Sequence, residues 1–224
     1  MNTNTLTTEI LARLRALPNY SLTNIRALRR EYSKRLAKEL PEDILALALR
    51  LIDEPGFEPR NFEPRFIAYE LIHHHRVALQ SVRAKDVQRL ARGLDSWYGV
   101  DTFAPLVAGP AWREGQIPDS LIHRWARSKD LWQRRAALVC TVALNNKARG
   151  GKGDAARTLA VCELLVADRE DMVVKAMSWA LRELAKRDPQ AVQAFVQKHE
   201  DKLAARVKRE VGNKLRTGLK NRRG

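Results

Sequence analysis

The chain has 224 residues, of which 45% are hydrophobic, so it can bury a substantial core and is not an intrinsically disordered protein. Its 41 Lys and Arg against 26 Asp and Glu give a net charge of +15, which predicts a polyanionic partner, with nucleic acid ahead of a membrane. The alternative is a charge that serves only solubility. The sequence contains neither a signal-peptide pattern nor the ~18 consecutive apolar residues of a membrane span, so we expect a cytoplasmic protein without membrane association.

Helical periodicity extends over almost the whole chain, and no segment shows the sustained alternation of a strand, so we predict an all-α protein of about twelve helices. Pro18 ends the first predicted helix, Ser21 is the N-cap of the second, and Pro41 opens the third. Segment 53–63 is the longest early loop, and the helical pattern is predicted to resume at Pro64.

A further helix is predicted from Trp97 until Gly109 and Pro110 stop it, and Pro105 should either kink it or shorten it after its first two turns. Asp130 is the predicted N-cap of the helix that follows.

The C-terminal part of the chain continues the same pattern. Asp154 caps another predicted helix, which is followed by helices over 171–187 and from Pro189. The last helix repeats apolar residues at every fourth position from Leu203 to Leu219. Helices thus recur in pairs every ~35–45 residues, the pattern of a HEAT-like repeat solenoid. We predict a single domain over residues 1–224, a right-handed superhelix of about six helix pairs whose basic concave face suits a duplex.

The motif SWYGVD, residues 96–101, contains the first candidate site residues. Trp97 and Asp101 are four positions apart, which places both on one face of a helix, away from its apolar stripe. Arg135 and Trp179 follow at intervals of about 40 residues, the spacing of equivalent positions on successive repeats. We therefore predict that these four side chains share one surface.

Two of these residues have an unusual place on their helices. Arg135 lies inside the apolar stripe, so its guanidinium must either pair with an acid or reach a phosphate. Trp179 lies off the stripe among cationic residues, which favours stacking or cation–π interaction, with a contact between helices as the alternative.

Other cations either contact DNA phosphates or are simply solvated. They are Arg26 and Arg30 in the second helix, Arg134 beside Arg135, Lys147 and Arg149 in the glycine-rich segment 146–153, and Lys175 and Arg182 beside Trp179. Segment 146–153 is predicted to be the most flexible loop.

Metal chemistry and disulfides are not predicted. The side chains of His73, His74 and His75 point about 100° apart on a helix, so they cannot jointly bind one ion. Cys140 and Cys162 lie in apolar helical runs, which indicates small core residues in a reducing compartment, and Trp125 is also predicted to be core.

Several motifs resemble the DNA alkylation repair family of AlkD-like HEAT-repeat glycosylases, over nearly the whole chain. They are SWYGVD, LWQRRAAL, KAMSWALRELAKRDP, RVKREVGNKL and, more weakly, EPRFIAYELI. The resemblance implies that Trp97 and Trp179 line the lesion site, that Asp101 is the catalytic carboxylate, and that Arg135, or Arg134 in its place, clamps the DNA backbone.

By this resemblance the protein is a glycosylase that hydrolyses the N-glycosidic bond of N3- or N7-alkylated purines in double-stranded DNA, with the lesion held in a concave groove without base flipping. We expect a monomer that needs no cofactor or metal. The chemistry agrees, because a cationic purine is a good leaving group and one carboxylate can stabilise the oxocarbenium-like sugar. The alternative is a non-catalytic HEAT-repeat scaffold for DNA or RNA, although such a scaffold would not need Asp101.

Overall fold

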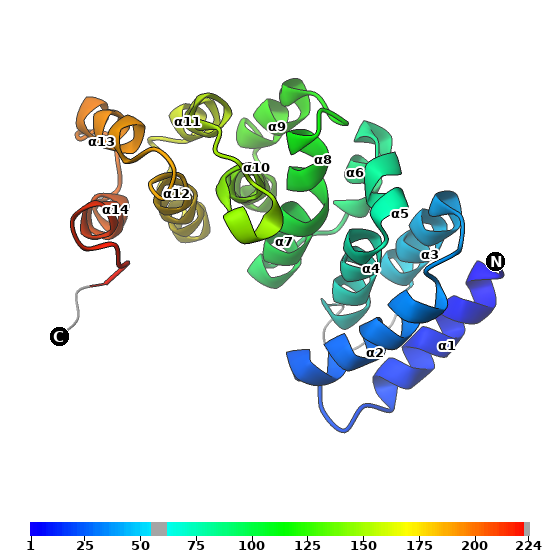
Figure 1. The fold of residues 1–224 in the computed structure, drawn as a ribbon. Helices are drawn as coiled ribbons and strands as arrows, with labels where there is room; N and C mark the ends of the chain where they lie inside the picture. Colours follow the sequence, from blue (N-terminus) through cyan, green and yellow to red (C-terminus); the bar gives the residue numbers. More distant parts are fainter. Residues whose placement is uncertain (55–61, 222–224) are drawn as a thin grey trace. The chain divides into compact units, whose positions relative to one another are not determined.

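The computed structural model describes residues 1–54 and 62–221, and all regular elements in these ranges are helices (Figure 1). No strand is present in these ranges, in agreement with the predicted all-α class. None of the described helices is long and apolar enough to cross a membrane. The helices gather into two compact units, Met1–Gly93 and Leu94–Gly224. The single domain over residues 1–224 therefore stays a prediction, as does the number of repeats.

Residues 1–54 and 62–93 of the first unit form six helices around an aliphatic core that includes Ile10, Leu47 and Ile67. The helices are α1 (Thr3–Arg15), α2 (Leu22–Arg35), α3 (Pro41–Asp53), α4 (Phe62–His74), α5 (Arg76–Ser81) and α6 (Ala84–Leu90). Ser21 caps α2 by accepting a hydrogen bond from the Asn24 amide at 3.3 Å, and Pro41 is the first residue of α3, as predicted.

The start of α4 differs from the prediction. The helix begins at Phe62, and Pro64 lies within its first turn instead of opening it. The first four amides of a helix have no partner within the helix, so a proline there costs no hydrogen bond. The predicted loop over 53–63 thus ends earlier, and its residues 55–61 lie outside the described ranges.

The second unit contains the four main candidate site residues, Trp97, Asp101, Arg135 and Trp179. Its α-helices are α7 (Trp97–Phe103), α8 (Gly109–Arg113), α9 (Asp119–Ala126), α10 (Leu131–Asn145), α11 (Ala155–Leu164), α12 (Asp171–Leu184), α13 (Pro189–Lys198) and α14 (Ala205–Thr217). In Figure 1, α9, α11 and α13 form one layer, and α10, α12 and α14 form the other. Helix α10 is central and packs against α7, α8, α9, α11 and α12, while α12 packs in turn against α14.

The residues predicted to stop the Trp97 helix, Gly109 and Pro110, do not stop it. The segment Ala104–Ala108 is a π-helical turn that joins α7 directly to α8, and the Gly109 amide donates to the Ala104 carbonyl. A wide turn of this kind accommodates the register change that prolines without amides require. Gly109 is present for packing, because a Cβ there would lie 2.7 Å from the Ala143 Cβ and the Cys140 carbonyl oxygen of α10. The chain therefore stays helical from α7 into α8 and packs closely against α10.

Segment 146–153 is also held more firmly than its composition predicts. Arg113 donates to the Arg149 carbonyl at 2.6 Å, and Arg187 donates to the Asn145 and Gly151 carbonyls at 2.8 and 2.6 Å. Gly151 is buried, and a Cβ there would lie 2.7 Å from the Asn146 nitrogen. The glycines thus permit a tight, hydrogen-bonded turn, so the prediction of a highly flexible loop is not supported by its contacts.

Candidate functional site

The side chains of Asp101 and Arg135 form an ion pair between α7 and α10. The Arg135 Nε donates to Asp101 Oδ1 at 3.0 Å, and Nη2 donates to Oδ2 at 2.9 Å. The remaining nitrogen, Nη1, donates to the Met172 carbonyl at the start of α12. Arg135 is only 5% exposed, as its place in the apolar stripe requires. Its partner in the free protein is therefore an acid, and one guanidinium connects three helices.

Asp101 is more accessible than its partner. Its side chain is 22% exposed, against 6% for the Arg135 side chain. Burial raises the pKa of Asp101, and the hydrogen bonds and charge of Arg135 oppose that rise. Each carboxylate oxygen has two lone pairs, so the bonds from Arg135 leave acceptor capacity on the carboxylate. The open edge of Asp101 can face a substrate while Arg135 holds its orientation.

An aromatic pair stands one turn before Asp101. Trp97 and Tyr98 are 41% and 44% exposed, and their rings are stacked with centroids 3.6 Å apart and planes inclined by 25°. Trp97 is thus on the surface, away from the core, as its position off the apolar stripe predicts. The contribution of Tyr98 was not predicted, because consecutive residues on a regular helix point about 100° apart.

Trp179 lies on α12, the helix whose first turn receives the bond from Arg135. It is half-buried, while the predicted stripe residues Val173, Ala176 and Leu184 are buried. Asp171 and Lys175 precede it at steps of four, so all three side chains lie on one face of α12. The structure therefore brings Asp101 and Arg135 into direct contact. It places Trp97 on α7 and Trp179 on α12, the two helices to which Arg135 of α10 donates hydrogen bonds.

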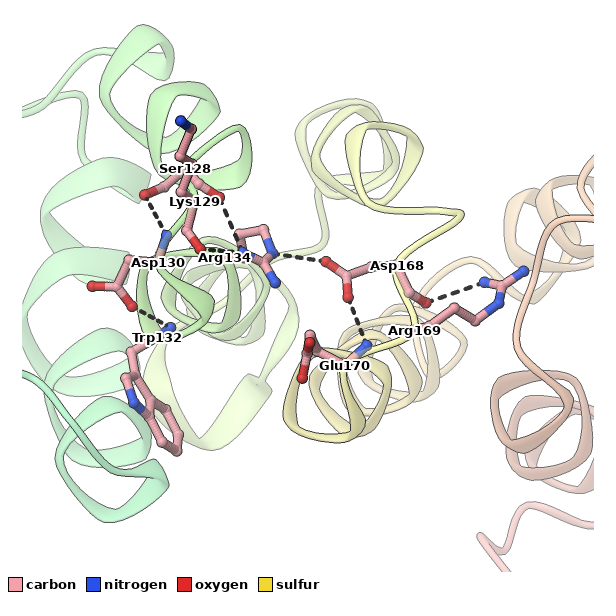
Figure 2. Close-up of polar contacts among 8 residues, drawn as sticks. All are labelled: Ser128, Lys129, Asp130, Trp132, Arg134, Asp168, Arg169 and Glu170. Carbon is pink, nitrogen blue, oxygen red and sulfur yellow. Dashed lines mark hydrogen bonds and ion pairs between the residues drawn. The ribbon is translucent and has the colours of Figure 1, made fainter.

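Arg134, the alternative to Arg135 as the DNA clamp, has a different set of partners (Figure 2). Its Nε donates to Asp168 Oδ2 at 2.8 Å, and its Nη1 donates to the carbonyls of Ser128 and Lys129 at 3.1 and 2.8 Å. Asp168 also accepts a hydrogen bond from the Glu170 amide at 2.9 Å. Arg134 thus joins the turn before α10 to the turn before α12.

The predicted cations near Trp179 are paired within the protein. Lys175 lies 2.7 Å from Asp171. Arg182 donates to Ser178 Oγ at 3.1 Å and lies 3.9 Å from Glu210 of α14, and burial lowers the pKa of its guanidinium.

The remaining predicted cations are more exposed. Lys147 and Arg149 lie in the 3-10 helix Lys147–Arg149, and both are exposed on the firmly held loop described above. In the first unit, Arg26 donates to Glu70 Oε1 at 3.0 Å and Arg30 is exposed on α2.

The histidine run has a structural use at a helix end. The Nδ1 atom of His75 caps α5 by accepting a hydrogen bond from the Ala78 amide at 3.1 Å. In the described ranges, no group of three His, Cys, Asp or Glu side chains could hold a metal ion. Cys140 and Cys162 are fully buried free thiols whose pKa values burial raises, and Trp125 is 5% exposed, so all three are core residues as predicted.

The described residues define an all-helical, strongly basic protein in which a partly exposed carboxylate, Asp101, is held by a buried arginine. A family model described as DNA alkylation repair enzyme matches residues 19–215, and the chain belongs to this family. This confirms the family resemblance seen in the sequence, and it makes the chain a member of a family of DNA repair enzymes. A search of curated proteins finds no match.

Proposed function

We propose that this chain is a DNA glycosylase that hydrolyses the N-glycosidic bond of N3- or N7-alkylated purines in double-stranded DNA, as a monomer and without a cofactor. The observation that carries the proposal is the Asp101–Arg135 pair, in which a partly exposed carboxylate is held by two hydrogen bonds at 3.0 and 2.9 Å, one helical turn after Trp97. Membership of the alkylation repair family supports the class of lesion.

The reaction needs little from the protein beyond a fixed negative charge. An alkylated N3 or N7 makes the purine cationic, so the base leaves without a general acid. The sugar approaches an oxocarbenium ion, which the Asp101 carboxylate stabilises while it orients the attacking water. Arg135 prevents the carboxylate from turning away, and this preorganisation is what makes an electrostatic partner effective.

Trp97 and Trp179 have a supporting role in this proposal. The face of an indole attracts positive charge, so each ring favours both the cationic base and the developing sugar cation. Tyr98 covers one face of Trp97, which leaves a single indole face for the substrate. The 41% exposure of Trp97 places its ring on an open surface, which suits a lesion that stays stacked in the duplex better than one flipped into an enclosed pocket.

The proposed activity is tested by incubating the protein with duplex DNA that contains 7-methylguanine. We expect release of free 7-methylguanine and heat-labile abasic sites in the lesion strand, with no cleavage of an unmodified duplex of the same sequence. DNA that is bound without release of base would contradict the glycosylase proposal.

The second candidate is a non-catalytic scaffold that binds DNA or RNA through its charge. One observation favours it: both carboxylate oxygens of Asp101 are bonded to Arg135, as in a purely structural pair. A scaffold predicts that Asp101→Asn lowers the melting temperature, whereas a glycosylase predicts a loss of excision by protein that remains folded.

A further inference from the structure

At the start of α12, the carboxylate of Asp171 bridges two cations. Its Oδ2 lies 2.7 Å from Lys175 Nζ on the same helix, and its Oδ1 accepts a hydrogen bond from Arg206 Nη1 of α14 at 2.9 Å. The three side chains are open to solvent, with exposed fractions of 60% for Asp171, 44% for Lys175 and 37% for Arg206. This is an accessible three-residue cluster between two helices, which we call the Asp171 cluster.

The Asp171 cluster lies at the start of α12, the helix that carries Trp179 and accepts the hydrogen bond from Arg135. Asp171, Lys175 and Trp179 share one face of α12 because they are four residues apart. Asp171 directly precedes Met172, whose carbonyl accepts a hydrogen bond from Arg135. Lys175, Arg206 and Arg135 together hold the pKa of Asp171 below its ordinary value, and the hydrogen bond from Lys175 is the largest cause. The cations around this carboxylate therefore favour a bound negative charge, and Asp171 is the neighbour of the residue that accepts the hydrogen bond from Arg135.

The cations of this cluster are exchangeable, unlike Arg182, which lies about two turns beyond Lys175 on α12. Arg182 and its partner Glu210 have side chains only 18% and 9% exposed, so their charges are committed to the packing of α12 on α14. Ion pairs as exposed as those of Asp171 add little stability because solvent screens them, so a phosphate group can replace the carboxylate. A phosphodiester carries the same charge as a carboxylate and accepts the same hydrogen bonds from Lys and Arg.

We propose that Lys175 and Arg206 form a binding site for one backbone phosphate of DNA, and that the Asp171 carboxylate occupies this site in the free protein as an internal competitor. The ligand follows from the proposed function, because a duplex on the Trp179 face brings phosphates to the first turn of α12. Arg206 is a new member of the DNA-binding surface. Asp171 weakens binding to any polyanion that does not displace it.

The test measures binding of undamaged duplex DNA over a series of salt concentrations. Asp171→Asn removes the competing charge, so affinity at 0.1 M salt should rise about two- to fivefold. Arg206→Gln and Lys175→Gln should each weaken binding by up to roughly tenfold and reduce the slope of log affinity against log salt by about 0.9, the value for one phosphate contact. In the Asp171→Asn background, Arg206→Gln should cost more affinity than in the wild type, because the arginine is then no longer partly neutralised.

Glu163→Gln is the matched control, since Glu163 of α11 also bridges two groups of another helix, Lys198 at 3.4 Å and His199 at 2.7 Å, in the opposite layer. This variant changes net charge by the same amount and should alter affinity by much less than Asp171→Asn. Equal effects of the two variants, or an Asp171→Asn protein that only melts at a lower temperature, would overturn the proposed phosphate site.

Excision of 7-methylguanine, measured on the same samples, separates this inference from the proposed function. If the wild type releases base but Asp171→Asn binds no more tightly than Glu163→Gln, only the phosphate site is wrong. If Asp171→Asn binds more tightly but the wild type releases no base, the result supports the phosphate site and contradicts the proposed glycosylase activity. A wild type that does not bind duplex DNA overturns both.

Discussion

Two neighbouring arginines of α10, Arg134 and Arg135, make ion pairs that differ in how exposed the acidic partner is. Arg134 and Asp168 are similarly enclosed, at 16% and 12% exposure, and Asp168 also accepts the Glu170 amide (Figure 2). In the Arg135 pair the arginine side chain is 6% exposed, while Asp101 keeps 22% of its side chain open beside Trp97. The same chemistry therefore serves two purposes: one pair ties turns together, and the other presents a fixed carboxylate. An accessible acid distinguishes the candidate site from a structural bridge.

Breaking the Asp101–Arg135 pair should have the largest effect on the stability of the protein. Arg135→Met leaves the Asp101 charge partly buried without a partner, which typically costs about 3–5 kcal/mol of stability. Excision and DNA affinity should fall as well, because the carboxylate loses its orientation and an uncompensated anion then faces the phosphates. Thermal and denaturant melts measure the loss of stability. A melting temperature equal to that of the wild type would show that the pair is not buried in solution.

The Arg134 pair should respond differently. Asp168→Asn removes one charge-assisted hydrogen bond at the turn, which should cost about 1.5–3 kcal/mol of stability. Excision per folded molecule should stay within about twofold of the wild type, because the Asp168 carboxylate bonds Arg134 and the Glu170 amide and not Asp101 or Arg135. Single-turnover assays below the melting transition test this, and a large loss of rate by the folded variant would contradict the structural role.

Trp179→Ala should have a smaller effect on rate than loss of Asp101. A cation–π contribution of about 0.5–2 kcal/mol corresponds to a roughly two- to thirtyfold slower excision, since Trp97 remains as a second aromatic face. The variant should be compared on 7-methylguanine with Trp179→Phe, which keeps an aromatic face for the positive charge. An equal loss of rate in the two variants would argue that Trp179 acts by its shape and not by attraction for the positive charge.

The pH dependence of excision should also distinguish the Asp101–Arg135 pair from the Asp168–Arg134 pair. Asp101 must be ionised to stabilise a cation, so excision should decline as the pH falls towards the pKa of Asp101. Burial raises that pKa, so the decline should begin at a higher pH than the ordinary value of about 3.9 for an aspartate predicts. Single-turnover rates between pH 4 and 8, corrected for spontaneous depurination without protein, measure this limb, and Asp168→Asn should leave it unchanged. A wild-type rate that stays flat down to about pH 4 would contradict a raised pKa for a catalytic Asp101.

Local signals in the sequence predicted much of the fold. Side-chain caps such as Ser21 and Asp130, and the burial of Arg135 in its apolar stripe, depend on residues within one or two turns of helix. The continuation through Gly109 could not be read this way, because it depends on the approach of Ala143 from another helix. For the same reason the glycines of 146–153 suggested flexibility although distant arginines hold the loop.

The candidate site was predictable only as far as its spacing. The spacing of four residues between Trp97 and Asp101 correctly indicated one face of a helix. The same spacing links Asp171, Lys175 and Trp179, but the prediction did not use it to place Asp171. The pairing of residues on different helices was not predictable in detail, because nothing in the sequence next to Asp101 or Asp171 indicates which residue of another helix is the partner. The roles assigned to these residues remain proposals.

Single-turnover excision of 7-methylguanine by Asp101→Asn, with melting and DNA affinity measured on the same sample, tests the central claim most directly. The substitution keeps the size and one hydrogen-bond acceptor of the side chain but removes its charge. We predict a rate about 10²- to 10³-fold below the wild type from protein that remains folded, with affinity for duplex DNA equal or slightly higher. Excision near the wild-type rate, or a loss that merely follows the unfolded fraction, would contradict a catalytic role for Asp101.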